Sequence, residues 1–128
     1  MIETEALPTD WQCAFTDGER EAIADTTAAN GGSGAGFRPH ELLEAAFATC
    51  LSMSVRMAAA ERGHRLDDVR TRVACDRSGE RPTFAYAIEI VGVSGETAEN
   101  LRDAVADCPV ATTLTGDPAV ERDPSLRE

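Results

Sequence analysis

Two cysteines in unlike settings are the residues of this chain best suited to chemistry. Cys50 lies within an apolar run of helical character, whereas Cys108 lies 58 positions later, where a second helical run meets Pro109. An ionised thiol is a nucleophile, and a second thiol can close a disulfide with it. The two cysteines are therefore either a redox pair in a thiol enzyme or two residues that fill the core.

The neighbours of Cys50 do not decide between these interpretations. A cysteine in an apolar helix is more often a core residue than a nucleophile, although the small residues at 45–49 leave room beside its sulfur. Burial raises the pKa of a thiol, so reactivity requires a nearby cation or hydrogen bond. The candidates are Arg38, His40 and Arg56. On a straight helix His40 lies about 15 Å from Cys50 and Arg56 lies on another face, so the local sequence supplies no activating group.

The other potential ligands and nucleophiles point to no metal or cofactor. Cys13 and Cys75 lie in predicted strands, lack a CxxC partner, and are interpreted as small hydrophobic residues. The two histidines, His40 and His64, are too far apart in the sequence for a metal pair on one helix. All 12 basic residues are arginine, which excludes Schiff-base chemistry through lysine. We expect neither a metal nor a cofactor.

Size and charge restrict the class of protein. The 128 residues predict a single domain over 1–128, in which residues 1–9 form a loose leader. A net charge of −11 argues against a nucleic-acid partner. The sequence has no apolar run of 18 residues and no apolar segment near its start, so we expect a cytoplasmic protein without a membrane span. Any disulfide there is transient and catalytic.

The elements that must position the cysteines follow from apolar periodicity. Short strands are predicted at 11–15 and 21–24, around an Asp-Gly turn, and the glycine-rich segment 30–36 is predicted to be a flexible connector. Pro39 opens a helix that runs to about Arg62 and stops at Gly63. Its apolar residues occur on most faces, which predicts a central, largely buried helix that carries Cys50.

The second half of the chain predicts a hairpin, a helix and a final strand. Residues 69–76 and 83–93 alternate in polarity as paired strands, and Val69, Thr71, Val73 and Cys75 share one face. Ser94 is placed to cap a helix at about 96–107, which leads to Cys108. A strand is predicted near 119–122.

Several of these motifs together resemble the OsmC/Ohr superfamily, the osmotically induced and organic hydroperoxide resistance proteins. The resemblance covers residues 20–122, and the order and spacing of the two cysteine motifs are specific. Three motifs surround the first cysteine: Asp25 followed by Gly31-Gly32, the segment 36–39 that leads into the helix, and the helix itself, with PHELL at 39–43 and ATCLSM at 48–53. Two short motifs follow the helix, ERG at 61–63 and LDDV at 66–69. The last motif is the segment 101–114, which contains Cys108-Pro109-Val110.

The resemblance implies an α+β fold and an intertwined homodimer, whose long central helices pack against antiparallel sheets. It also implies a cysteine-based peroxidase: Cys50 attacks the peroxide, Cys108 resolves the product to a disulfide, and an external dithiol reduces the pair. Active-site groups can then arrive across the dimer.

The sequence departs from the best-defined peroxidases of the superfamily at two places. Those proteins have a glutamate directly after the helix-opening proline, where this chain has His40 and places Glu41 one position later. They also have an arginine in the N-terminal sheet, and residues 8–11 here contain none. The form of the motif resembles a broader OsmC-like branch. Arg38, His40 and Glu41 are therefore predicted only as supporting residues.

Three functional hypotheses follow. The first is a homodimeric, thiol-dependent hydroperoxide reductase in oxidative-stress defence, with Cys50 and Cys108 as catalytic residues and Arg38 as the candidate cation near Cys50. The second is a non-catalytic dimeric module that binds a small apolar ligand on the same fold. The third, a structural interaction protein, has no positive feature behind it. Neither the substrate nor the physiological reductant follows from the sequence.

Overall fold

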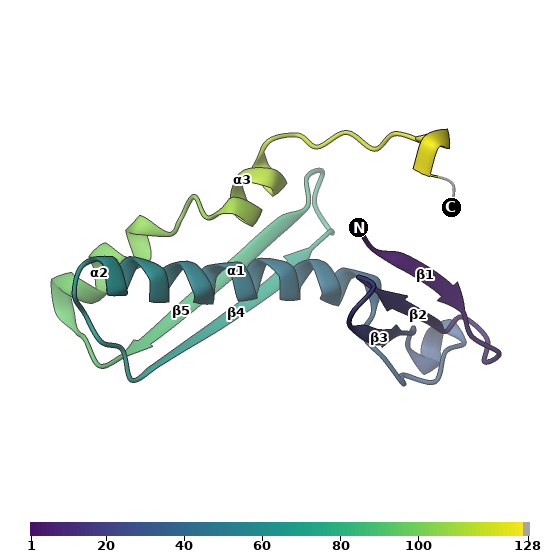
Figure 1. Cartoon of the computed structure of the whole chain (residues 1–128), viewed down its shortest axis with the longest axis horizontal. Coiled ribbons are helices and arrows are strands. Elements are labelled where there is room, and N and C mark those ends of the chain that lie inside the picture. Colours follow the sequence, from purple (N-terminus) through teal and green to yellow (C-terminus); the bar gives the residue numbers. More distant parts are fainter. Residues whose placement is uncertain (127–128) are drawn as a thin grey trace. The chain divides into compact units, whose positions relative to one another are not determined.

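The computed structural model describes residues 1–126 as a mixture of helices and small sheets, which confirms the α+β class (Figure 1). Its contacts divide the chain into two compact units. Unit 1 comprises Met1–Ala45 and Ala74–Ala85, and unit 2 comprises Ala46–Val73 and the described residues from Tyr86 onward. Three elements run from one unit into the other: α1 (Pro39–Glu61), β4 (Asp68–Asp76) and β5 (Thr83–Val91). A single domain over 1–128 stays a prediction.

Unit 1 contains an antiparallel sheet of order β1-β2-β3 (Glu3–Ala6, Cys13–Thr16 and Glu21–Ala24). The prediction of a loose leader over 1–9 is wrong at β1, where Glu3 pairs with Thr16 and Ala6 with Cys13. Every β1 side chain is exposed. Backbone hydrogen bonds rather than burial hold this strand, so its sequence has no apolar alternation to reveal it.

The predicted turn between β2 and β3 forms at Asp17-Gly18. The Asp17 carboxylate accepts hydrogen bonds from the backbone N–H groups of Glu19 (2.9 Å) and Arg20 (2.7 Å), while Gly18 has a φ of 98°. The first strand of the hairpin begins at Cys13 rather than at the predicted Trp11. The backbone of Trp11 has a φ of 69°, which is incompatible with a strand.

The glycine-rich segment that follows β3 is held in place by hydrogen bonds to Asp25, so the prediction of a flexible connector is wrong. The buried Asp25 carboxylate accepts hydrogen bonds from Gln12 Nε2 (3.1 Å), Ser33 Oγ (2.8 Å) and the backbone N–H of Ala35 (3.0 Å). A Cβ at Gly32 would lie 2.2 Å from the carbonyl oxygen of Thr26. The loop is therefore wrapped around one carboxylate, with contacts that leave no room for a side chain at Gly32.

Helix α1 begins and ends as the sequence predicts. Glu41 makes the acidic half of a capping box, because its carboxylate accepts a hydrogen bond from the backbone N–H of Arg38 at 2.8 Å. At the other end, Gly63 has a φ of 74°, and the N–H groups of Gly63 and His64 bind the carbonyls of Ala60 and Ala59. This is a Schellman motif, which explains why the helix stops before Gly63.

Unit 2 has an apolar core to which α1 contributes one face, and the ring of Phe47 packs edge-on against Tyr86. The opposite side of α1 is exposed at Met53 (55%) and Met57 (63%), so the prediction of a largely buried helix is wrong for a single chain. By length and composition α1 could also cross a membrane, but core helices of soluble proteins pass the same test. The core residues are Phe47, Leu51, Val55, Ala58, Ala59, Ile88, Ile90, Ala98, Leu101, Val105, Cys108 and Ala111.

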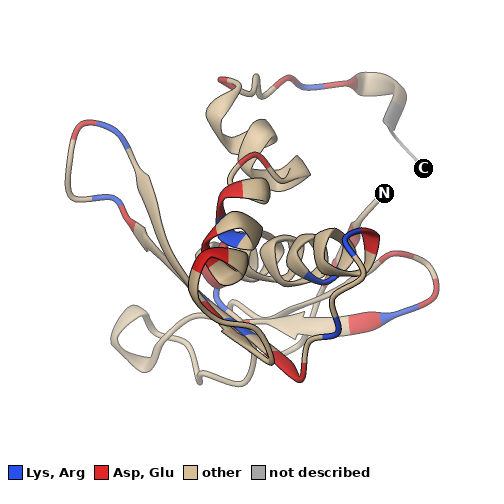
Figure 2. Cartoon of the chain, turned by 90° about the vertical axis from the view of Figure 1, so that its left-hand side faces the viewer, with Lys and Arg blue, Asp and Glu red and all other residues tan. Residues whose placement is uncertain are grey.

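The two-faced pattern predicted for the hairpin is confirmed. Alternate β4 residues from Val69 to Cys75 are half-buried, and Ile88 and Ile90 of β5 are buried. In unit 2, Thr71 Oγ1 donates to the carbonyl of Ala48 (2.9 Å), which fixes β4 to α1. The turn between the strands carries charges of both signs (Figure 2).

The predicted helix over 96–107 is α2 (Gly95–Ala104), which ends three residues earlier than predicted. A further helix that the sequence analysis did not predict, α3 (Pro109–Thr115), follows. Pro109 cannot donate a backbone hydrogen bond, so the chain breaks before it and a new helix starts there. Ser94 is the N-cap residue of α2, but its side chain makes no capping hydrogen bond.

The predicted strand near 119–122 is wrong. In the described residues this segment is irregular, and Val120 is 100% exposed. The apolar pair Ala119-Val120 suggested a strand, yet a strand requires a neighbour to which it can donate backbone hydrogen bonds. A short 3₁₀ turn, η2, follows at Pro124–Leu126.

Candidate active site

Helix α1 positions the Cys50 thiol at the edge of its buried face. The preceding turn places Phe47 in the core, and Leu51 next to Cys50 is fully buried. Cys50 itself is half-buried and makes no disulfide. Its sulfur is thus held by a rigid element, while part of the side chain stays accessible to a small molecule.

Cys108 lies at the junction of two elements, where the chain turns from α2 into α3. It is the N-cap residue of α3, its own N–H donates to the carbonyl of Val105, and its carbonyl accepts from Thr112 at 3.0 Å. Only 4% of the residue is exposed. The proline that breaks the helix therefore also fixes the thiol, because it forces residue 108 into the non-helical cap conformation.

The two thiols interact within unit 2, and their role as a redox pair stays a prediction. Burial raises the pKa of the Cys108 thiol, and its side-chain hydrogen bond and charge interaction with Cys50 raise it further. The backbone N–H groups of Ala111 and Val110 act in the opposite direction but do not prevail. Cys108 therefore keeps its proton at neutral pH.

This arrangement suits sequential thiol chemistry. Cys50, the more exposed of the two residues, can meet a reagent first, and the protonated thiol of buried Cys108 can then react with what forms on Cys50. A disulfide between them closes a loop of the chain that runs through β4, β5 and α2. Two electrons are available from the pair without any bound cofactor.

The three predicted supporting residues lie at the start of α1. Arg38 and Glu41 bind each other, with Arg38 Nε 3.0 Å and Arg38 Nη2 2.9 Å from Glu41 Oε1. The N–H and guanidinium of Arg38 lower the pKa of the Glu41 carboxyl. His40 lies on the exposed first turn of the helix. This pairing stabilises the helix start, and a role of these residues toward Cys50 stays a prediction.

The remaining cysteines, Cys13 and Cys75, lie in the strands β2 and β4. Cys13 is paired with Ala24 between β2 and β3. Cys75 is half-buried in β4, and its backbone N–H donates to the Glu44 carboxylate at 2.7 Å. Sequence reasoning missed this use of Glu44, for which the only signal is an acidic residue on an otherwise apolar part of α1.

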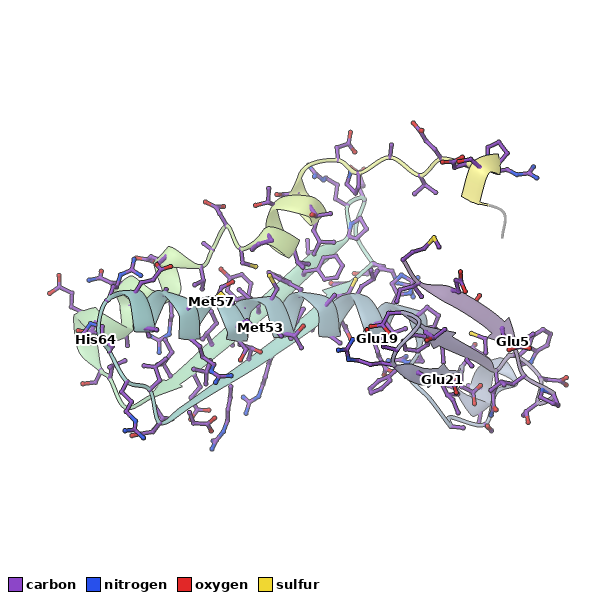
Figure 3. All side chains as sticks on the ribbon, in the orientation of Figure 1. Glu5, Glu19, Glu21, Met53, Met57 and His64 are labelled. Atoms are coloured by element: carbon purple, nitrogen blue, oxygen red, sulfur yellow. The ribbon has the colours of Figure 1, made fainter. Side chains whose placement is uncertain are left out.

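Sequence reasoning also missed a shallow hollow on the exposed side of α1. Met53, Arg56, Met57 and Ala60 line this hollow of about 300 Å³, and both methionines are labelled on the helix in Figure 3. Two methionines four residues apart are the available signal, but the apolar pattern of the whole segment predicts a largely buried helix and no exposed hollow. Their thioethers follow Cys50 by three and seven positions, so all three sulfurs lie along one stripe of α1.

The described residues contain no group of three or more His, Cys, Asp or Glu side chains that could hold a metal ion. The two thiols of the site are therefore its only strong ligands of those types within residues 1–126.

Comparisons with known proteins bear on the fold and the family. No curated protein matches the chain. Among solved structures, an organic hydroperoxide resistance protein from Legionella pneumophila is 23% identical, with a TM-score of 0.67 over 91% of this chain and 89% of that one.

Two further structures have the same fold. An OsmC-like protein from Mycoplasma pneumoniae is 20% identical, with a TM-score of 0.74 over 91% of this chain and 87% of that one. The organic hydroperoxide resistance protein OhrB of Bacillus subtilis is 19% identical, with a TM-score of 0.65 over 91% and 90% of the two chains. A model of the family described as OsmC-like protein matches residues 31–122, which is well over half of the sequence. The chain therefore belongs to the OsmC-like family.

Proposed function

We propose that this protein is a thiol-dependent hydroperoxide reductase in oxidative-stress defence. The observation that carries the proposal is the interaction between the thiols of Cys50 and Cys108. Membership of the OsmC-like family and the fold of hydroperoxide resistance proteins support it. Arg38, His40 and Glu41 have supporting roles in this proposal.

The reaction divides into three balanced steps. The Cys50 thiol loses its proton and its sulfur attacks one peroxide oxygen; the O–O bond breaks, leaving a sulfenic acid on Cys50 and an alcohol that takes up the proton. The Cys108 sulfur then attacks the sulfenic sulfur, forms a disulfide and releases water. An external dithiol finally supplies two electrons and two protons, and is itself oxidised to a disulfide.

Burial supports the assignment of the two roles. Cys50 is half-buried and can meet a small peroxide, whereas Cys108 is buried. The raised pKa of the Cys108 thiol makes it a poor first nucleophile but leaves it able to attack an adjacent electrophilic sulfur. A thiol that reacts only second protects the pair from indiscriminate oxidation.

The proposal includes a homodimer in the cytoplasm. The exposed apolar residues Leu43, Met53 and Met57 of α1 support it, because a second copy that covers them removes this surface from water. A small peroxide and a dithiol reductant are the other partners. The proposal needs neither nucleic acid nor a membrane.

The test measures free thiols in the reduced protein before and after one equivalent of cumene hydroperoxide. We expect the loss of two thiols per chain and one equivalent of cumyl alcohol. Cys50→Ser should abolish the rapid loss, whereas Cys108→Ser should leave a sulfenic acid that a dimedone probe traps on Cys50. Cys13→Ser is the matched control and should react like the wild type.

An unchanged rate in Cys50→Ser would rule out the proposed nucleophile. If the Cys108→Ser protein formed a disulfide as fast as the wild type, another cysteine would be the resolving residue. Circular dichroism of each variant distinguishes a lost reaction from a lost fold.

The hollow beside Met53 and Met57 favours a second candidate function, a module that binds a small apolar ligand. Native mass spectrometry of the purified protein tests this candidate. A retained apolar molecule that is lost in Met57→Glu, together with thiols inert to excess peroxide, would replace the first proposal with the second.

A further inference from the structure

Unit 2 has a polar hollow that the proposed reductase does not use. It is formed by α1 and by the residues that lead into β4, and its volume is about 280 Å³. This polar hollow differs from the apolar one beside Met53 and Met57, with which it shares only Arg56. The residues that line it are Ser52, Arg56, Leu66, Asp67, Asp68 and Val69.

The polar hollow is lined by opposite charges that are not paired. Within residues 1–126, the guanidinium of Arg56 and the carboxylate of Asp67 make no ion pair or hydrogen bond, either with each other or with another described side chain. Asp68 differs, because its Oδ2 pairs with Arg70 Nε at 2.9 Å and its Oδ1 accepts from the N–H of Val69. Among the described residues, Arg56 therefore offers the hollow an unpaired cation and Asp67 an unpaired anion.

The backbone holds both unpaired residues in place. The N–H of Asp67 donates to the carbonyl of Val91 at 2.8 Å, at the end of β5. Gly92 packs against Asp67, since a Cβ there would lie 2.8 Å from the Asp67 nitrogen and 3.2 Å from its Oδ2. Arg56 follows Ser52 by one helical turn on α1, so the two side chains share a face of that helix.

The charges on both sides decide which ligand fits. A guanidinium donates two hydrogen bonds to a carboxylate, and a serine hydroxyl can donate another, whereas a carboxylate accepts from an ammonium group. A ligand with a single charge would satisfy only one of Arg56 and Asp67. The net charge of −11 also repels a simple anion, but it does not repel a ligand whose own charges cancel.

We propose that the polar hollow binds a small zwitterionic amino acid. Its carboxylate is held by Arg56 and the hydroxyl of Ser52, and its ammonium group is held by Asp67. Binding is reversible and breaks no covalent bond. The lining residues take no part in the three steps proposed for peroxide reduction, so the binding site and the reductase stand or fall separately.

The test is calorimetric titration of the full-length chain with glycine, β-alanine and 4-aminobutyrate. The distance between the carboxylate and the ammonium group increases along this series, so the tightest probe reports the spacing between Arg56 and Asp67. At least one of the three should bind. Butyrate and butylamine, which each carry only one of the two charges, should bind at least ~10-fold more weakly than that probe.

Variants assign the binding to the two charges. Arg56→Gln and Asp67→Asn should each weaken binding of the tightest probe at least ~10-fold, because each removes one charge-assisted hydrogen-bonding partner. Arg72→Gln and Asp103→Asn are matched controls that remove exposed charges elsewhere in unit 2, and they should bind like the wild type. Circular dichroism checks that every variant is folded.

Three results would overturn the proposal. The first is no binding of any of the three amino acids at millimolar concentration. The second is butyrate or butylamine binding as tightly as the best amino acid, because one charge would then be enough. The third is an unchanged affinity in Arg56→Gln or Asp67→Asn. None of these results affects the thiol loss with cumene hydroperoxide, and a chain that is inert to peroxide but binds an amino acid through Arg56 and Asp67 contradicts only the proposed reductase.

Discussion

Asp25 in unit 1 and Cys108 in unit 2 are both buried acids, with 3% and 4% of each residue exposed, but their surroundings are opposite. The Asp25 carboxylate accepts hydrogen bonds from side chains and backbone, led by the N–H of Ala35, and these hold its pKa well below the usual range. Burial among apolar groups raises the pKa of the Cys108 thiol instead.

The difference shows that burial alone does not set the charge of a side chain. A buried group stays ionised where donors replace the lost water, and stays neutral where the donors present do not outweigh burial, as for Cys108. In unit 1 the charge is structural, because it organises the loop around 26–36. In unit 2 the Cys108 thiol stays neutral among apolar neighbours.

The largest expected effect comes from placing a buried carboxylate, like that of Asp25 in unit 1, in the apolar core of unit 2. Cys108→Asp puts a carboxylate into the apolar core, where its desolvation costs several kcal/mol. The backbone N–H groups of Ala111 and Val110, which do not outweigh burial for the thiol, offset only part of this cost, so we expect a melting temperature more than about 10 °C below that of the wild type. Cys108→Ser is the matched control and should melt within about 10 °C of the wild type. Thermal circular dichroism checks both. A Cys108→Asp protein as stable as Cys108→Ser would show that donors near residue 108 can satisfy a charge.

Removal of the buried Asp25 carboxylate from unit 1 should have the next largest effect. Asp25→Ala leaves the N–H of Ala35 and the amide of Gln12 without their acceptor, and we expect the melting temperature to fall by about 10 °C. Asp10→Ala removes an exposed carboxylate nearby in sequence and should change it by less than about 2 °C. Equal effects in the two variants would mean that the Asp25 hydrogen bonds do not stabilise the loop.

The sequence predicted the parts of the fold that its local chemistry determines. Pro39 and Gly63 bracket α1 because proline favours a first turn and glycine a left-handed cap, and the structure has the helix between them. The strand β1 and the irregular segment 119–122 were mispredicted. Pairing with another strand, which a short segment does not encode in its own pattern, decides whether such residues form a sheet.

The two cysteines of the candidate site could be singled out from the sequence, but their environment could not, and their catalytic role stays a prediction. The types and spacing of Cys50 and Cys108, with the resemblance, pointed to a pair, and the structure brings their thiols together. The hydrogen-bonding of Asp25 and Glu44 was not predictable, because a carboxylate reveals its partners only after distant backbone groups are in place.

A steric change to the loop around Asp25 should have a smaller effect than loss of the carboxylate. Gly32→Ala forces a Cβ to within 2.2 Å of the Thr26 carbonyl, so the backbone must shift, and we expect a loss of about 1–3 kcal/mol. Gly34→Ala is the matched control in the same loop. It meets no neighbouring atom and has only the strain of a φ of 70°, about 1 kcal/mol. Urea unfolding compares the two, and the reverse order would contradict the close packing at Gly32.

Acid should weaken unit 1 through the same carboxylate. The folded-state pKa of Asp25 lies below its unfolded value of about 3.9. Its contribution is therefore complete above that value and is lost as the pH falls through it toward the folded-state pKa. Urea midpoints between pH 6 and pH 3 should fall more steeply for the wild type than for Asp25→Asn. Parallel profiles would show that this carboxylate is not selectively stabilised by folding.

Alkaline pH should weaken unit 2, with the smallest effect of the series. The folded-state pKa of Cys108 lies above its unfolded value of about 8.5, so folding favours the protonated thiol. The stability that this group contributes is present in full below pH 8.5 and is lost as the pH rises through the folded-state pKa. Under anaerobic, reducing conditions, the urea midpoint of the wild type should fall between pH 8 and pH 10 relative to that of Cys108→Ala, which has no thiol to ionise at this position. Because Asp25 titrates only at acid pH, Asp25→Asn should show the same fall of the urea midpoint between pH 8 and pH 10 as the wild type. If instead the urea midpoint of Cys108→Ala fell between pH 8 and pH 10 as in the wild type, and that of Asp25→Asn did not, the alkaline loss of stability would come from Asp25 and not from the Cys108 thiol. That outcome would contradict the contrast between the charged pocket of unit 1 and the neutral core of unit 2.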